Sequence, residues 1–289
     1  MKKQIQLILN GAFTCLLLAL ANPSYADSKS GNYEVGLSMY SLKALFKSGE
    51  LTAFDYPAFA KEKFGITKID VWDGAFPKGY KDDADFLPEL KRRADAAGSE
   101  IFLVMTGTIK PSPDNDNETA KSGLKFKFAV DQAEILGAKY VRVFMRGDAK
   151  ADEAENLRRF ALALAPLADY AKSKDITIAI EPNRSAPLGS FYAKLVENMQ
   201  HTHITLMPDF GKMRTTDFYQ GTKDMLPYST VISAKTHDIN EDGSAEGFDY
   251  PRLMKIIKES DFKGIIAIEY EGKKPAPVEG VLATKKLIE

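Results

Sequence analysis

Cysteine is almost absent from this sequence of 289 residues, and the one that it has, Cys15, lies near the N-terminus. The rest of the chain therefore has no disulfide framework, no thiolate metal site and no cysteine nucleophile. Histidine occurs three times and tryptophan once. Stability has to come from a hydrophobic core, and a chain of this length is long enough to bury one.

An excess of charge of either sign is also lacking. The chain has 39 basic and 40 acidic residues, a formal net charge of −1. Such a balance excludes the basic surface that binds nucleic acid or anionic membranes. With 44% hydrophobic and 27% charged residues, the composition is that of an ordinary soluble globular protein. We therefore expect a small-molecule partner, with no nucleic acid.

Long apolar runs are confined to the N-terminus. Lys2 and Lys3 precede a mostly apolar run over residues 5–20, and Ser24-Tyr25-Ala26 places small residues at −3 and −1 of a cleavage site. This pattern predicts a signal peptide over residues 1–26, followed by a single domain over residues 27–289. The run is too short for a spanning helix. We expect an exported protein, periplasmic or secreted, with no membrane association once the signal peptide is removed.

Short β-branched or apolar runs alternate with amphipathic ones along the remaining chain, which is typical of βα units. The predicted helices include 85–97, 119–136, 152–174, 190–201 and 250–260. A doubly wound sheet would show a glycine-rich turn after its first strand, and none is present. The pattern therefore predicts an α/β fold, a single (β/α)8 TIM barrel. The eight predicted strands are 33–40, 66–72, 100–106, 140–145, 176–181, 204–209, 231–237 and 264–270.

Active sites of such barrels lie at the carboxyl ends of the strands. The last four predicted strands each end with one ionisable group, Glu181, Asp209, His237 and Glu269, spaced by roughly 30 residues, which is about one βα unit. Three carboxylates and an imidazole at one mouth would repel one another without a cation. Their oxygen-rich donor set suits Mn²⁺, Mg²⁺, Co²⁺ or Zn²⁺, so we expect a divalent metal ion as cofactor.

Other strand ends carry residues suited to substrate binding. Trp72 offers an indole face for a sugar ring. Arg142 and Arg146 are two positions apart on the fourth strand, where an inward arginine would bind substrate and the alternative is an outward ion pair. Asn183 and Arg184 follow the fifth strand closely enough to bind hydroxyl or carboxylate groups, and Lys235 lies near the end of the seventh. The polar segment 108–118 reads as a long loop over the active-site mouth.

Two phrases carry a family resemblance: Ile-Ala-Ile-Glu-Pro-Asn at 178–183 and Ile-Ala-Ile-Glu-Tyr-Glu-Gly at 266–272. With Asp209 and His237 at the intervening strand ends, the chain resembles the xylose-isomerase-like sugar isomerases and epimerases over nearly all of its mature length. The resemblance implies that Glu181, Asp209, His237 and Glu269 hold a divalent metal. It also implies that the two glutamates face the reacting substrate carbon.

Two stretches depart from the family pattern. Many members place His or Asn shortly after the strand-six Asp, where this chain has Gly211 and Lys212. Strand seven commonly reads His-x-Lys-Asp, whereas this chain reads Lys235-Thr236-His237-Asp238. Alignment on the Lys puts Ser233 at the ligand position, and alignment on the Asp puts Lys235 there. We favour His237, because an ammonium has no lone pair to give a metal; Lys235 replacing the ligand or the metal is the alternative.

The leading functional hypothesis is a metal-dependent isomerase or epimerase of an unphosphorylated sugar or sugar derivative. Glu181 and Glu269 would transfer a proton beside a carbonyl through a metal-stabilised enediolate. One alternative is a lyase or hydrolase acting on oxidised sugars in the same pocket, and another is a sugar-binding protein without catalysis. The nuclease branch of the family is disfavoured, because it uses several metal ions and many histidines.

Overall fold

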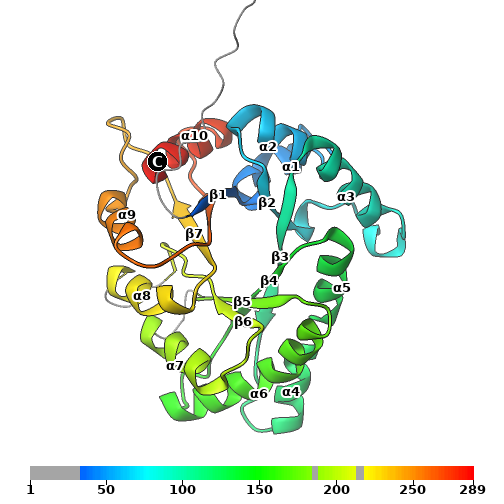
Figure 1. Cartoon of the computed structure of the whole chain (residues 1–289), viewed down its shortest axis with the longest axis vertical. Helices are drawn as coiled ribbons and strands as arrows, with labels where there is room; N and C mark the ends of the chain where they lie inside the picture. Colours follow the sequence, from blue (N-terminus) through cyan, green and yellow to red (C-terminus); the bar gives the residue numbers. More distant parts are fainter. Residues whose placement is uncertain (1–32, 184–187, 213–217) are drawn as a thin grey trace, which may run out of the picture.

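The computed structural model describes residues 33–183, 188–212 and 218–289, and its strands form one parallel sheet. The sheet order is β6-β5-β4-β3-β2-β1-β8-β7, and isolated bridges from Leu206 to Ser229 and from Asp209 to Ser233 join its two edges. The result is a nearly closed barrel, which confirms the predicted (β/α)8 fold (Figure 1). Its strands are β1 (Glu34–Leu37), β2 (Lys68–Trp72), β3 (Glu100–Ile109), β4 (Tyr140–Met145), β5 (Thr177–Glu181), β6 (Ile204–Leu206), β7 (Val231–Thr236) and β8 (Ile265–Tyr270). The predicted signal peptide and Arg184 lie outside the described residues.

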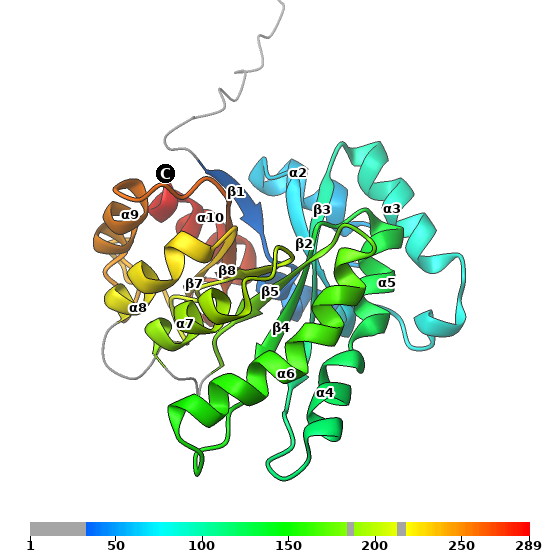
Figure 2. The ribbon, with the colours of Figure 1, turned by 60° about the horizontal axis from the view of Figure 1, so that its bottom comes forward.

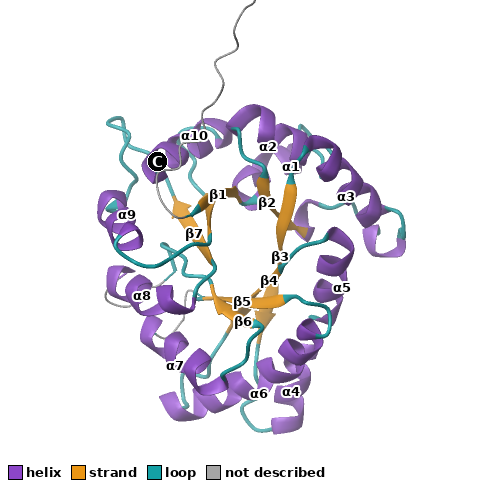
Figure 3. Cartoon of the chain, in the orientation of Figure 1, coloured by secondary structure: helices purple, strands orange, loops and turns teal. Residues whose placement is uncertain are grey.

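The helices surround the strands as an outer ring (Figure 3). Within the described part of the chain, no helix has the length and apolarity needed to cross a membrane. The predicted helix 119–136 is in fact two helices, α4 and α5. Gly123 near the end of α4 lies so close to α6 that a Cβ there would approach the carbonyl oxygen of Ala163 to 2.0 Å, so α4 packs on α6 before the chain turns away. The helices are α1 (Lys43–Ser48), α2 (Tyr56–Phe64), α3 (Phe86–Ala97), α4 (Asp116–Leu124), α5 (Lys127–Leu136), α6 (Glu153–Lys172), α7 (Gly189–Met199), α8 (Phe218–Met225), α9 (Tyr250–Lys258) and α10 (Pro277–Ile288).

Strand alternation divides the core into two layers. Side chains such as Ile180, Ile232 and Ile266 point outward and pack in the cluster beneath the helices. Their neighbours point into the barrel, where a second cluster fills the interior with Phe102, Leu103, Met105, Ala179, Met207, Val231, Ile265 and Ala267. Because side chains alternate along a strand, residues two positions beyond an interior side chain face the same side. This rule places Glu181, Asp209 and Glu269 on the interior, at the carboxyl ends of their strands.

The segment predicted as a long loop over residues 108–118 is shorter than expected. Strand β3 continues to Ile109, and α4 begins at Asp116. Figure 2 shows this connection at the lower edge of the molecule, beside the loop between β4 and α6. Its role as a lid over the mouth stays a prediction.

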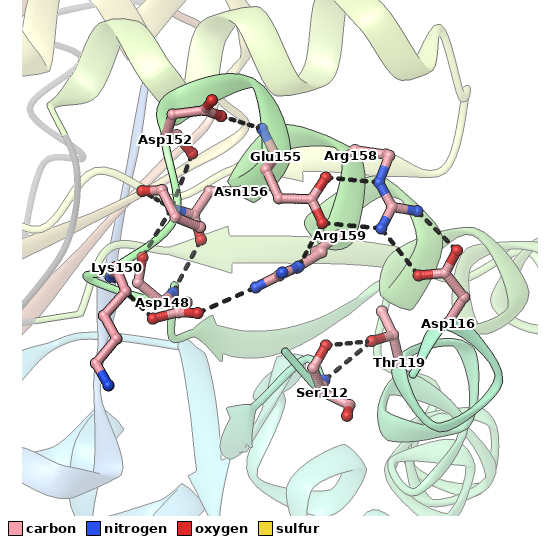
Figure 4. Close-up of polar contacts among 11 residues, drawn as sticks. Ser112, Asp116, Thr119, Asp148, Lys150, Asp152, Glu155, Asn156, Arg158 and Arg159 are labelled. Atoms are coloured by element: carbon pink, nitrogen blue, oxygen red, sulfur yellow. Dashed lines mark hydrogen bonds and ion pairs between the residues drawn. The ribbon is translucent and has the colours of Figure 1, made fainter. Parts of the chain in front are cut away.

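A polar network ties that connection to α6 (Figure 4). The Arg158 guanidinium donates two hydrogen bonds of 2.9 Å to the Asp116 carboxylate and also bonds Glu155 on its own helix. Asp152 caps α6 by accepting a 2.8 Å hydrogen bond from the backbone N–H of Glu155. These contacts hold the starts of α4 and α6 together, next to the carboxyl end of the barrel.

Candidate active site

Three buried carboxylates converge inside the barrel mouth. Glu181 ends β5, Asp209 follows β6, and Glu269 lies in β8. Each offers an oxygen atom, and these atoms all lie within 4.8 Å of one another. Glu181 and Asp209 have no exposed surface, and Glu269 is 3% exposed. The structure thus brings together three of the four residues predicted to hold a metal, as an acidic triad that could bind one.

Lys235, on strand β7, is a cation in direct contact with this triad. Its ladder partner across the sheet is Glu269, so both residues lie at the same level of the barrel. The ammonium nitrogen lies 3.0 Å from Asp209 Oδ2, 3.1 Å from Glu269 Oε1 and 2.7 Å from Glu271 Oε1. Although predicted as a substrate-binding residue, Lys235 binds three carboxylates in this structure.

Two further cations surround Glu181. The Lys212 ammonium lies 2.8 Å from Glu181 Oε1 and 3.4 Å from Asp209 Oδ2. Arg142 Nε lies 3.0 Å from Glu181 Oε2, and Arg142 Nη1 donates to the carbonyl oxygen of Thr106. Both cations lie over the Phe144 ring, about 4 Å from its centre. Arg142 therefore faces the interior with Glu181 as its partner, and its predicted contact with a substrate stays a prediction.

Neighbouring groups fix the positions of these side chains. Ser233 Oγ donates a 2.6 Å hydrogen bond to Glu269 Oε2, and the Tyr250 hydroxyl donates to the backbone carbonyl oxygen of Lys235 at 2.9 Å. The backbone N–H of Gly211 donates to Asp209 Oδ1 at 2.6 Å. A Cβ at Gly211 would lie only 2.6 Å from Lys235 Cδ. Glycine at this position therefore leaves the space that the Lys235 stem occupies.

Burial and charge move the pKa values of these groups in different directions. Burial raises the pKa of Glu181 to about 7, although Lys212 and Arg142 oppose the rise. Burial also acts to raise the pKa of Asp209, but the ammonium groups of Lys235 and Lys212 outweigh it and hold that pKa well below its usual range. Near neutral pH, Glu181 can therefore gain or lose a proton while Asp209 remains a carboxylate.

Asp70 is a buried carboxyl that the sequence analysis did not single out. It lies in β2 with no exposed surface; Oδ1 accepts a 2.8 Å hydrogen bond from the backbone N–H of Met39, and Oδ2 has no partner. Burial raises the pKa of Asp70 to about 8. The sequence feature that could have identified Asp70 is an acidic residue between Ile69 and Val71 within a predicted strand. Such a position faces the interior when its neighbours face the helices.

The imidazole of His237 is not part of the triad's surroundings. His237 follows Thr236, the last residue of β7, and its half-buried ring lies 5.8 Å from the Phe248 ring. Regular alternation places Ser233 and Lys235 inside the barrel. His237 lies beyond the end of the strand, so this alternation does not place it. It is absent from the converging ligand atoms found among the described residues, so its role as a metal ligand stays a prediction.

The remaining predicted substrate-binding residues lie at strand ends as expected. Trp72 ends β2 and packs edge-on against Tyr40, with ring centres 4.9 Å apart. Asn183 follows β5 and is half-buried. Their contact with a substrate stays a prediction. Lys43 lies over the Tyr40 ring and forms an ion pair of 3.1 Å with Glu271, which connects this aromatic pair to the charged cluster.

Comparison with known proteins points to one family. A family model described as xylose isomerase-like TIM barrel matches residues 58–288. No curated protein matches the sequence. Similar solved structures include the IolI protein with a bound zinc atom, at 15% identity and a TM-score of 0.67 over 88% of this chain and 96% of that one.

Two epimerases are also similar in structure. A 3-keto-D-glucoside 4-epimerase, YcjR, from E. coli has 11% identity and a TM-score of 0.65, covering 89% of this chain and 98% of its own. An L-ribulose 3-epimerase has 14% identity and a TM-score of 0.68, covering 89% and 93%. At these identities the likeness concerns the fold alone.

Proposed function

This chain belongs to the xylose isomerase-like TIM barrel family, and we propose that it is a sugar isomerase or epimerase that moves a proton at the carbon beside a carbonyl group. The observation that carries the proposal is the convergence of Glu181 and Glu269. Their carboxylate oxygens lie within 4.8 Å of each other, on two strands of one barrel mouth. Two such groups around one carbon can remove a proton and return one.

The surroundings suit the two glutamates to these roles. Glu181, with its pKa raised to about 7, can exchange a proton near neutral pH, as an acid–base group must. Glu269 is oriented by Ser233 Oγ and Lys235 Nζ. Removal of a proton beside a carbonyl places negative charge on the carbonyl oxygen, and a cation close to that oxygen lowers the barrier.

Two kinds of cation could stabilise the negative charge on the carbonyl oxygen. The sequence predicts a divalent metal ion, Mn²⁺, Mg²⁺, Co²⁺ or Zn²⁺, on the acidic triad, and the similar IolI structure has a zinc atom. The ammonium groups of Lys235 and Lys212 lie at the same carboxylates. The metal stays a prediction.

The proposed substrate is an unphosphorylated sugar or sugar derivative. Support comes from two proteins of similar structure, an L-ribulose 3-epimerase and a 3-keto-D-glucoside 4-epimerase, whose names give sugars without a phosphate group. In the proposed complex, the Trp72 and Tyr40 rings contact the apolar face of the sugar, and Asn183 binds its hydroxyl groups. A lyase acting on an oxidised sugar would use the same proton removal, and its product would distinguish it.

Solvent isotope exchange tests the proposal directly. We expect the protein in D₂O to place deuterium beside the carbonyl of at least one ketose, aldose or keto-glucoside, as measured by NMR. Glu181→Gln and Glu269→Gln should slow this exchange by about 10²–10⁴-fold. Glu259→Gln, which changes an exposed residue of a distant ion pair, should leave the rate unchanged. No exchange into a broad panel would contradict the proposal, and a dehydrated product would indicate the lyase.

A further inference from the structure

We propose that Lys235, assisted by Lys212, takes the place of a divalent metal ion, so that this barrel has a lysine-bridged, metal-free centre. The catalytic use of that centre rests on the proposed function, but its existence does not. Three observations carry the inference: the balance of charge, the position of the ammonium groups and the way the surrounding chain accommodates Lys235.

The charges of the centre balance without an added ion. Among the described residues, ion pairs connect four carboxylates with four cations. A divalent ion would add two positive charges to a cluster that is already paired and whose three converging carboxylates are buried. Unpaired charge in such surroundings is strongly unfavourable. The paired residues are Glu181, Asp209, Glu269 and Glu271 with Lys43, Arg142, Lys212 and Lys235.

The ammonium groups occupy the level at which a metal ion would bind. A metal requires oxygen or nitrogen ligands about 2.0–2.6 Å from one shared point. Asp209 and Glu269 instead contact the Lys235 ammonium at 3.0 and 3.1 Å, and Glu181 contacts Lys212 at 2.8 Å. Lys235 also lies in register with Glu269, where β7 would supply a ligand, and an ammonium has no lone pair. With the ammonium groups of Lys235 and Lys212 at these oxygens, the carboxylates leave no place for the metal ion that they could otherwise bind.

The chain around Lys235 is shaped for a long side chain. Gly211 leaves room for the lysine stem, since a Cβ there would approach Lys235 Cδ to 2.6 Å and Cγ to 3.2 Å. The Tyr250 hydroxyl holds the Lys235 backbone through its carbonyl oxygen. Lys235 itself is 2% exposed, so its position is set by packing on all sides. These features indicate that the fold accommodates the Lys235 side chain at this position in the barrel interior.

In such a centre, ammonium groups instead of a metal ion stabilise the negative charge that forms on the substrate. The ammonium groups of Lys235 and Lys212 can donate hydrogen bonds to an oxygen that becomes negative when Glu181 or Glu269 removes a proton. Charge-assisted hydrogen bonds of this kind are among the strong ones in proteins. They act without a redox-active or exchangeable ion.

Metal content measured by mass spectrometry tests the inference without any activity assay. Wild-type protein, incubated with Mn²⁺ or Zn²⁺ and then dialysed, should retain less than about 0.1 ion per chain, since no open ligand set binds it. Lys235→His replaces the ammonium with an imidazole donor and should gain about one ion per chain. Its melting temperature should rise by about 5–10 °C when the free metal reaches about 100 times its Kd.

A second variant controls for adventitious binding. Adding Asp209→Asn to Lys235→His removes a carboxylate ligand and should abolish the gained ion. If Lys235→His fails to fold, the wild-type measurement still decides: about one tightly held ion per wild-type chain overturns the inference. The two proposals can fail separately. Metal-free protein that exchanges no deuterium would support the lysine centre and contradict the proposed function. Active protein that holds a metal ion would support the proposed function and overturn the lysine centre.

Discussion

At the scale of single residues, Lys235 determines how the site is understood. One ammonium contacts three carboxylates, Asp209, Glu269 and Glu271, at the centre of the barrel mouth. Removing one partner from a buried set of charges leaves the others uncompensated. The side chain is therefore a stability determinant as well as a candidate for stabilising charge on a substrate.

Truncation of this lysine should destabilise the fold. We expect Lys235→Met to lower the free energy of unfolding by about 3–5 kcal/mol, the usual cost of breaking a buried charge pair, as measured by urea denaturation. Lys68→Met is the matched control, because its glutamate partners are more than half exposed, and it should cost less than about 1 kcal/mol. Equal costs for the two variants would show that the Lys235 pairs contribute nothing special.

Asp70 should make stability depend on pH. Its pKa rises from 3.8 to about 8 on folding because burial disfavours the charged carboxylate. Between these values the unfolded chain releases a proton that the folded chain retains, so this group lowers stability as pH increases from about 4 to 8. Below pH 4 the carboxyl is protonated in both states, and the penalty disappears.

Asp70→Asn should remove this dependence, because the amide keeps the acceptor for the Met39 N–H and carries no charge. Relative to wild type, the variant should gain on the order of a few kcal/mol of unfolding free energy between pH 4 and pH 8. Urea titrations at both pH values measure the difference. An unchanged difference between variant and wild type across this range would exclude the predicted titration of Asp70.

The residues of the site were predictable to different extents. Glu181, Asp209 and Glu269 were found because each ends a strand and barrel sites collect there. Glu271 and the Asp70 carboxyl were not assigned roles, because their contacts depend on side-chain directions that spacing alone does not give. At strand seven, Lys235 contacts the carboxylates Asp209 and Glu269 and His237 lies beyond the end of β7, while the role of His237 as a metal ligand stays a prediction.

At the scale of elements, regular strands were the easiest to predict. Strand β4 matches its predicted range, and β7 ends one residue earlier than expected, at Thr236. That single residue matters because it removes His237 from the strand. The prediction of one helix over 119–136 was wrong. The helical spacing of apolar residues runs on across the break, but packing of α4 on α6 makes the chain turn there. No residue ranges were predicted for helices α1, α2, α8 and α10.

The close approach between the segment after β6 and strand β7 leads to an element-scale prediction. Gly211→Ala should force the Lys235 stem away from the carboxylates and lower stability by about 1–3 kcal/mol, as overpacking does. A double-mutant cycle with Lys235→Ala measures the coupling, because without the stem the added methyl has space. If Gly211→Ala costs as much in the Lys235→Ala background, the glycine is not there to accommodate lysine.

At the scale of the whole molecule, the barrel accounts for every described strand, and the family match covers residues 58–288. The signal peptide predicted over residues 1–26 stays a prediction about where the protein is sent.

The predicted signal peptide leads to a prediction about export and cleavage. Expressed with its full sequence in a bacterium that has a secretion system, the protein should be recovered from the periplasm or medium and begin at Asp27, because Ser24-Tyr25-Ala26 forms the cleavage site. N-terminal sequencing makes the measurement, and Ala26→Arg should block processing as a control. Recovery of cytoplasmic protein that retains Met1 would refute the prediction.

The central claim combines proton transfer by Glu181 and Glu269 with a cationic centre made of lysine. The most direct test is the deuterium exchange rate into the best sugar substrate after exhaustive treatment of the protein with a chelator. The account predicts that treated and untreated wild-type protein exchange at the same rate, and that Lys235→Met slows exchange in both. Loss of exchange on chelation, with recovery on adding Mn²⁺ or Zn²⁺, would contradict it.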